Sequence, residues 1–152
     1  MRVTAKVDYA VRAAIELAAA EPGQPVKGDR ISQAQGIPVK FLENILAELK
    51  RHGLVSSRRG ADGGYWLARP PAAITVADLI RAVEGPLANV RGLQPQEVEF
   101  HGSAEPLQRM WIAVRASMRG VLENVTLADL QSGTLPKKVD KLADTPDAWS
   151  PR

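Results

Sequence analysis

The side chains that could do chemistry in this chain are basic rather than nucleophilic or metal-binding. The sequence contains no cysteine, which excludes thiol catalysis, disulfides and metal centres built on thiolates. His52 and His101 stand far apart, without the carboxylate spacing of a metal site. No nucleophile–base set or phosphate-binding loop signature is present either, so we expect neither an enzyme nor a metal-binding protein.

The positive charges are concentrated in the first half of the chain. Residues 1–70 carry 11 Lys and Arg against 7 Asp and Glu, whereas residues 71–152 carry 9 against 10. Five of these cations lie close together in the sequence, namely Lys50, Arg51, Arg58, Arg59 and Arg69. Such a cluster suits a polyanionic partner such as nucleic acid, although a solvated basic face is the ordinary alternative.

A helix-turn-helix is predicted to position part of this cluster. After a first helix from the N-cap Thr4 to about residue 20, a short helix spans about residues 28–35 and a longer one about 39–52. Gly36-Ile37-Pro38 forms the break between the last two. The longer helix places Leu42, Ile45, Leu46 and Leu49 on one apolar stripe, which leaves Val39, Lys40, Glu43 and Asn44 facing outward. In helix-turn-helix proteins these outward positions reach base edges, although they are also ordinary solvent positions on a small helical domain.

A β-hairpin is predicted directly after that helix. Two strand-like runs, residues 54–58 and 65–68, flank the turn RGADGG, and Arg58 and Arg59 stand at its edge. We expect Gly60, Gly63 and Gly64 to take positive φ and to let backbone N–H groups approach phosphates. A phosphate-binding P-loop is the rival interpretation, but its lysine-serine signature is missing. A basic hairpin after a recognition-type helix is typical of the wing of a winged helix.

A long apolar helix is predicted in the C-terminal half. Thr75 and Asp78 form a capping-box pattern for a helix that ends near residue 85, and an irregular stretch follows. The next helix spans about residues 106–124. Its apolar seam recurs at alternating spacings of four and three and consists of Leu107, Trp111, Val114, Met118, Val121 and Val125. We expect this seam to be buried against both the N-terminal helix and a second subunit, burial against the N-terminal helix alone being the alternative.

These patterns predict a mainly α fold: a winged helix-turn-helix with a two-stranded wing and a long C-terminal dimerisation helix. The expected divisions are a DNA-binding domain at 1–86, a loop at 87–104, the dimerisation helix with a short following helix at 105–133, and a mobile tail at 134–152 with a short turn at 137–142. Charged residues interrupt the N-terminal segment, and no run approaches the roughly 18 apolar residues of a membrane span. We therefore expect a cytoplasmic protein.

Several segments resemble, in order, the Rrf2-type regulators, the group of the iron–sulfur cluster regulator, the nitric-oxide-sensing repressor and the cysteine-metabolism repressor. The resemblance is close over residues 1–86 and holds in outline over 105–131. Its segments are 6–13 (KVDYAVRA), 36–38 (GIP), 41–46 (FLENIL), 53–60 (GLVSSRRG), 63–65 (GGY), 67–70 (LARP), 74–75 (IT) and 83–85 (VEG). It implies a bacterial, dimeric winged-helix repressor on a palindromic operator. It also implies that Val39, Lys40, Phe41, Glu43 and Asn44 lie at the major groove, with Arg59 and the glycine turn at the minor groove or its phosphates.

The chain departs from this group at one point. Many members hold an iron–sulfur cluster with three cysteines in the loop that corresponds to residues 88–104, and this chain has none. Asp8 matches the acidic fourth ligand of the nitric-oxide sensors, but a single carboxylate cannot hold a cluster. We therefore expect no such cofactor, and expect Asp8 to act as a helix-dipole or ion-pair residue. A small metabolite, a partner protein or no effector at all remain open as the signal.

The sequence thus favours a homodimer that binds operator DNA sequence-specifically and represses transcription. Lys50, Arg51, Arg58 and Arg59 are the expected phosphate contacts, and Lys40, Glu43 and Asn44 the expected base-discriminating residues. The alternative is a winged-helix adaptor module that docks proteins without binding specific DNA.

Overall fold

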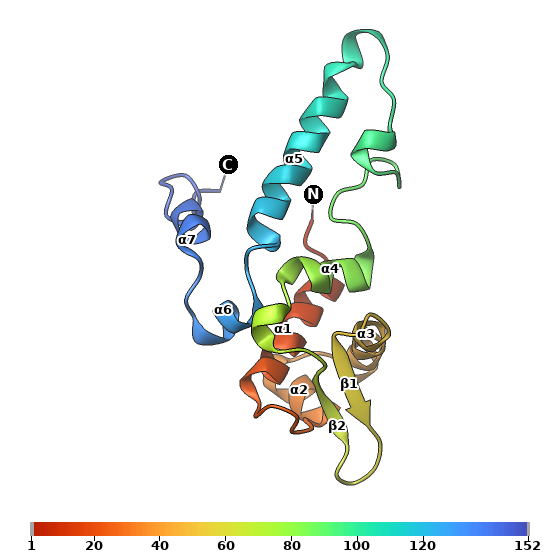
Figure 1. Ribbon diagram of the computed structural model, residues 1–152, viewed down its shortest axis with the longest axis vertical. Coiled ribbons are helices and arrows are strands. Elements are labelled where there is room, and N and C mark those ends of the chain that lie inside the picture. The colour runs from red at the N-terminus through yellow and green to blue at the C-terminus, as the bar shows by residue number, and fades with distance from the viewer. Residues whose placement is uncertain (1, 152) are drawn as a thin grey trace.

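The computed structural model describes residues 2–151, so Met1 of the predicted DNA-binding domain and Arg152 of the predicted tail lie outside the described residues. A winged-helix body forms one end of the molecule, and a long helix projects from it (Figure 1). The helices are α1 (Ala5–Ala19), α2 (Gly28–Gln35), α3 (Val39–Arg51), α4 (Val76–Glu84), α5 (Pro106–Leu122), α6 (Leu127–Ser132) and α7 (Lys137–Ala143). The strands are β1 (Val55–Arg58) and β2 (Gly64–Leu67), and short 3-10 turns lie at η1 (Pro71–Ala73), η2 (Pro95–Glu97) and η3 (Gly102–Ala104). The predicted fold class is confirmed.

The helix starts follow local capping chemistry. The Thr4 hydroxyl accepts a hydrogen bond from the Val7 amide at 3.2 Å and begins α1. Thr75 and Asp78 form the predicted capping box at α4, with reciprocal bonds of 3.0 and 3.1 Å. Thr126 and Asp129 repeat the box at α6, and hydrogen bonds from the Thr126 backbone and side chain lower the pKa of Asp129. Each box satisfies amides that the helix itself leaves without partners.

The turn between α2 and α3 has the predicted helix-turn-helix geometry. Gly36 ends α2 in the left-handed conformation at φ 62°, and the Ile37 amide bonds back to the Ser32 carbonyl at 3.1 Å. Pro38 directly precedes the first residue of α3. The change of direction is therefore completed within three residues, which fixes α3 against α2.

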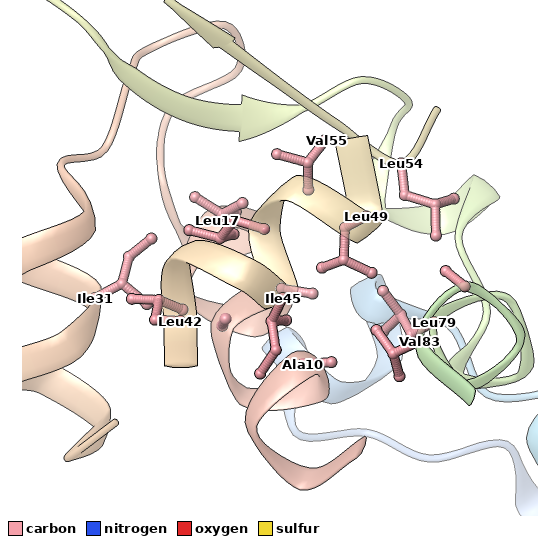
Figure 2. Close-up of a cluster of buried hydrophobic side chains, with 14 of the residues drawn as sticks. Ala10, Leu17, Ile31, Leu42, Ile45, Leu49, Leu54, Val55, Leu79 and Val83 are labelled. Carbon is pink, nitrogen blue, oxygen red and sulfur yellow. The ribbon is translucent and has the colours of Figure 1, made fainter. Parts of the chain in front are cut away.

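The core orients α3 by holding its apolar stripe. Leu42, Ile45, Leu46 and Leu49 are each at most 1 % exposed. They pack with residues of α1, α2, β1 and α4, among them Leu17, Ile31, Val55 and Leu79 (Figure 2). Burial of a leucine or isoleucine side chain contributes about 1.5–3 kcal/mol, so this stripe strongly resists rotation of the helix. The opposite face of α3 must then point outward.

The wing, defined as residues 55–67, is an antiparallel hairpin pinned to the segment before α2. Val55 pairs with Leu67 at its base and Arg58 with Gly64 at its end. Val26 forms an isolated bridge with Tyr65 through two backbone hydrogen bonds of 2.8 Å each. The two-stranded wing therefore carries a third, single-residue pairing on its β2 side.

Helix α5 runs from the end of the molecule opposite the winged-helix body down toward that body, and none of its 17 residues is buried (Figure 1). Its packing within the subunit is against η2 and α4. Gln108 additionally donates a hydrogen bond to the Val98 carbonyl at 2.8 Å, which ties the preceding loop to the helix. The expectation that α5 packs along the N-terminal helix of its own subunit is wrong, because its contacts within the subunit are with η2 and α4 instead.

After α6 the C-terminal segment turns back toward the level of α5, to the left of it in this view (Figure 1). The turn predicted at 137–142 is the helix α7, whose Val139 is buried. Trp149 donates to the Ala143 carbonyl at 2.6 Å and closes the end of that helix. Mobility of the tail stays a prediction. Across residues 2–151, no helix combines the length and apolarity that crossing a membrane would require.

Candidate nucleic-acid interface

The outward face of α3 is open along its first two turns. Val39 is 42 % exposed, and Lys40, Glu43 and Asn44 are exposed as well. Within the described part of the chain, Lys40, Glu43 and Asn44 make no side-chain hydrogen bond or ion pair. Their donors and acceptors are therefore available to an external partner. We call these four residues the recognition face.

Phe41 lies beside the recognition face and also packs against α1. Its ring packs edge-on against Tyr9 with centroids 5.6 Å apart, so it joins α3 to α1. The Arg12 guanidinium lies 4.9 Å above the Tyr9 ring and pairs with Asp8 at 2.7 Å. Asp8 is thus an ion-pair residue, one of the two roles predicted for it. Phe41 is 41 % exposed, so part of its ring is still available at the surface.

Three of the cations predicted to contact phosphates, Lys50, Arg58 and Arg59, line the groove where α3 meets the wing, and the fourth, Arg51, lies on the neighbouring surface of α3 on the side of Asn44. Lys50 donates to the Ser57 hydroxyl at 2.8 Å, and Arg58 donates to the Asp62 carbonyl at 3.1 Å. Arg51 and Arg59 are exposed and make no side-chain hydrogen bond or ion pair to residues 2–151. Because hydroxyl and carbonyl partners are neutral, all four side chains keep their positive charge for an anion. The structure thus brings Lys50, Arg58 and Arg59 together in one groove and places Arg51 on the adjoining surface of α3.

Other cations nearby are neutralised. Lys6 pairs with Glu48 at 2.9 Å, just as Arg12 pairs with Asp8. The first ion pair joins α1 to α3, and the second lies within α1. Together they neutralise two positive charges near the interface. Lys6 and Arg12 therefore contribute little charge to an anion, unlike the cations between α3 and the wing.

Sequence reasoning missed Lys27, which lies in the same groove. The groove between α3 and the wing is lined by Lys27, Lys50, Arg58, Arg59, Gly60 and Tyr65, among others. Lys27 reaches it from the residue before α2 and donates to the Gly60 carbonyl at 2.8 Å. Nothing in the local sequence marks this lysine, because its partner lies 33 residues away.

The backbone conformations of the wing glycines follow the prediction at two of the three positions. Gly60 and Gly64 take positive φ, 105° and 149°, as expected. Gly63 does not. It is glycine because an added Cβ would overlap the Arg58 carbonyl oxygen, and its amide is bonded to the Gly60 carbonyl at 3.0 Å. A Cβ on Gly64 would lie 2.6 Å from the Val26 carbonyl oxygen. Gly63 and Gly64 therefore close the wing and pack it, and Gly63 has no free amide for a phosphate.

The seam of α5 remains half-exposed. Leu107, Trp111, Val114, Met118 and Val121 are all partly accessible, and the neighbouring Met110 is 42 % exposed. Val125 differs from them, because it lies beyond α5 and is 5 % exposed within its own subunit. Its carbonyl accepts a hydrogen bond from the Val76 amide at 2.9 Å. The seam available to another molecule thus consists of the first five residues.

Comparison with known proteins matches residues 3–133 to the Rrf2 family, described as iron-dependent transcriptional regulators. The chain belongs to the Rrf2 family. This Rrf2 protein is 49 % identical over 144 residues to Rv1287 of Mycobacterium tuberculosis, named as a helix-turn-helix transcriptional regulator, covering 95 % of this chain and 89 % of the relative. It is 37 % identical over 135 residues to the regulator CymR of Bacillus subtilis, covering 88 % and 92 %.

Solved structures agree with this assignment. CymR of B. subtilis, described as a global cysteine regulator, superposes with a TM-score of 0.74 at 36 % identity, over 88 % of this chain and 98 % of that one. IscR of T. potens gives 0.71 at 36 % identity, over 88 % of each chain. The protein is accordingly a DNA-binding transcriptional regulator with a winged-helix fold, and the relatives it matches are regulators rather than enzymes.

The residues of this Rrf2 protein do not fit an iron–sulfur cluster. The chain supplies no thiolate. In the loop before α5, the Glu97 carboxylate accepts a hydrogen bond from the Gln94 amide at 2.9 Å, and Asp8 is held by Arg12. Among residues 2–151, no three His, Asp or Glu side chains gather closely enough to bind a metal ion. The donor set therefore disagrees with the iron dependence in the family's description.

Proposed function

We propose that this Rrf2 protein binds a palindromic operator as a homodimer and represses transcription by occupying it. The observation that supports this most directly is that the unpartnered recognition face of α3 adjoins un-neutralised cations on the same helix and on the neighbouring wing. One such surface reads one half-site. Two copies related by a twofold axis read a palindrome when their α3 helices lie about 34 Å apart, which is one turn of DNA.

The recognition face would supply sequence discrimination. Asn44 offers both a donor and an acceptor and can bond an adenine edge in two places, while Lys40 suits guanine and Glu43 suits cytosine. Val39, an exposed apolar side chain, suits a thymine methyl group. Each good base contact is worth about 1–3 kcal/mol of discrimination. Phe41 would contribute through its exposed edge while keeping α3 against α1.

The cations would supply affinity without sequence preference. Lys50 and Arg58 line the groove between α3 and the wing, Arg51 lies on the adjoining surface of α3, and Arg59 begins the turn at the tip of the wing. We assign the first three to phosphates of the major-groove flanks and Arg59 to the minor groove or its phosphates. Such contacts release counterions, so binding would weaken steeply as salt rises.

Helix α5 would carry the dimer contact. It projects from the body with no buried side chain, and its seam includes Trp111, Val114 and Met118 (Figure 1). A 17-residue helix with such a surface needs a partner, and a second copy of the same helix offers a matching seam. Replacing Met118 by Asp is expected to shift the protein to monomers in sedimentation velocity, with Ser117→Asp on the exposed side as its control.

We further propose that DNA binding needs no cluster. The support is chemical, since the chain has no thiolate and the one matching carboxylate, Asp8, is already paired. Protein purified aerobically with a chelator is expected to bind operator as tightly as protein prepared under anaerobic, iron-replete conditions. A cluster absorbance in the second preparation, with a change in affinity, would contradict this.

The experiment that tests the proposal is operator selection from a random duplex library, followed by competition binding. The wild type is expected to select two inverted half-sites. Asn44→Ala is expected to lower the preference for that operator over random duplex by about 1–3 kcal/mol while leaving random binding unchanged. Ala116, which is exposed on α5 and does not line the groove, provides the control variant Ala116→Ser. No enrichment of any sequence, or an Asn44→Ala variant with undiminished preference, would overturn it.

A further inference from the structure

The wing is clamped to the helix-turn-helix by the three residues before and at the start of α2. Val26 pairs with Tyr65 through two backbone bonds of 2.8 Å. The Gly28 position lies against the Tyr65 ring, since a Cβ there would be 3.6 Å from its Cε2 atom. Lys27 donates to the Gly60 carbonyl at 2.8 Å. The first two contacts hold the middle of the wing, and the third holds its tip.

The tip of the wing, residues 59–63, depends on this third contact. Strand pairing ends at Arg58 and Gly64, so the tip lies outside the ladder. The Gly60 carbonyl accepts from the Gly63 amide inside the turn and from Lys27 outside it. Arg58 of the wing also donates to the Asp62 carbonyl of the tip, but among the described residues the bond from Lys27 is the one hydrogen bond that joins the tip to an element outside the wing. Arg59 directly precedes its acceptor.

We infer that Lys27 is a positioning residue for the wing, which sets where Arg59 stands relative to α3. This inference rests on the proposed contact of Arg59 with DNA. Lys27 is the N-cap residue of α2, the first helix of the helix-turn-helix, so its bond ties the tip to the element that directs α3. The wing tip and the recognition helix then present themselves to a duplex as one rigid unit.

A lysine suits this position because it bonds without losing its charge. Its acceptor is a neutral carbonyl, so Lys27 adds a positive charge to the groove that holds Lys50 and Arg58. The bond is exposed, and its removal leaves no buried polar group without a partner. Substitution at Lys27 should therefore loosen the tip while the body stays folded.

The DNA-free test measures the tip directly. In Lys27→Met, hydrogen exchange of the Gly63 amide is expected to accelerate about 2–10-fold, the range that corresponds to loss of one ordinary hydrogen bond. Lys27→Arg retains a long donor and should restore slow exchange. Arg30→Met removes a charge from an exposed position on the same helix and should leave exchange unchanged. An unchanged exchange rate of the Gly63 amide in Lys27→Met would overturn the inference that Lys27 positions the wing tip.

A double-mutant cycle on DNA then separates positioning from simple charge. The probe is a duplex selected by the wild-type protein, and the four proteins are the wild type, Lys27→Met, Arg59→Ala and the double variant. If Lys27 acts through the wing tip, Lys27→Met weakens binding in the wild-type background and has at most a small effect once Arg59 is gone. Equal losses in both backgrounds would make Lys27 an independent phosphate contact and overturn the inference. An Arg59→Ala variant that binds normally would instead remove the proposed wing contact, and this inference with it.

Discussion

The salt dependence of operator binding follows from the charges at the interface. Each subunit offers Lys50, Arg51, Arg58 and Arg59 with neutral partners or none among the described residues, whereas Lys6 is neutralised by Glu48. A dimer therefore brings about eight phosphate-contacting cations. At about 0.9 counterions per contact, the plot of log K against log salt should have a slope near −7. Affinity should then fall about 10⁴-fold between 50 and 200 mM salt.

Removing one of these cations tests the same reasoning. Arg59→Ala deletes one contact per subunit and two per dimer, so the slope should become shallower by about 2, for operator and random duplex alike. Fluorescence anisotropy titrations at four or more salt concentrations measure it. Arg109→Ala, at an exposed position on α5 far from the wing, is the control and should leave the slope unchanged. A wild-type slope shallower than about −3, or an Arg59→Ala slope equal to that of the wild type, would refute the assignment of these cations.

Two further predictions concern stability. Gly63→Ala is expected to destabilise the fold by about 1–3 kcal/mol in chemical denaturation, because its Cβ would overlap a wing carbonyl. Gly120→Ala, in helical conformation with open space, should instead stabilise it by about 0.5–1 kcal/mol, and equal effects would contradict this explanation. Hydrogen bonds from Arg81 and Arg119 lower the pKa of Glu123 below its ordinary 4.5. The stabilisation by Glu123 is therefore present above pH 4.5 and lost as pH falls through its folded pKa, so acid unfolding of Glu123→Gln should depend less on pH over that range.

The parts of the fold that could be predicted are those determined by residues close together in the sequence. The capping-box pair Thr75 and Asp78 predicted the start of α4, and Gly36 followed by Pro38 predicted the turn before α3. The apolar stripe of α3 also fixed its outward face, since a helix with one buried stripe must expose the other side. The recognition face therefore followed from periodicity alone.

Contacts between distant segments could not be predicted in the same way. The bond from Lys27 to Gly60 joins two exposed positions, and no periodicity or motif links them. A glycine in a turn likewise indicates only that a side chain is disfavoured at that position. Whether φ or a nearby carbonyl forbids it, as at Gly60 and Gly63 respectively, depends on three-dimensional packing.

The element that covers the apolar seam of α5 could not be predicted from the sequence either. The spacing of Trp111, Val114 and Met118 indicates an apolar seam that needs cover, but it does not say which element provides it. Within the subunit the preceding loop provides part of this cover, because η2 packs against α5, Pro95 and Val98 are buried there, and Gln108 bonds to the Val98 carbonyl.

Hydroxyl-radical footprinting on a selected operator tests the central claim most directly. The account predicts two protected regions related by inversion and centred one DNA turn, about 10 base pairs, apart, each lost when Lys40, Glu43 and Asn44 are replaced together by alanine. A single protected region without symmetry, or a symmetric footprint that survives the triple replacement, would contradict the claim that paired α3 helices read the operator.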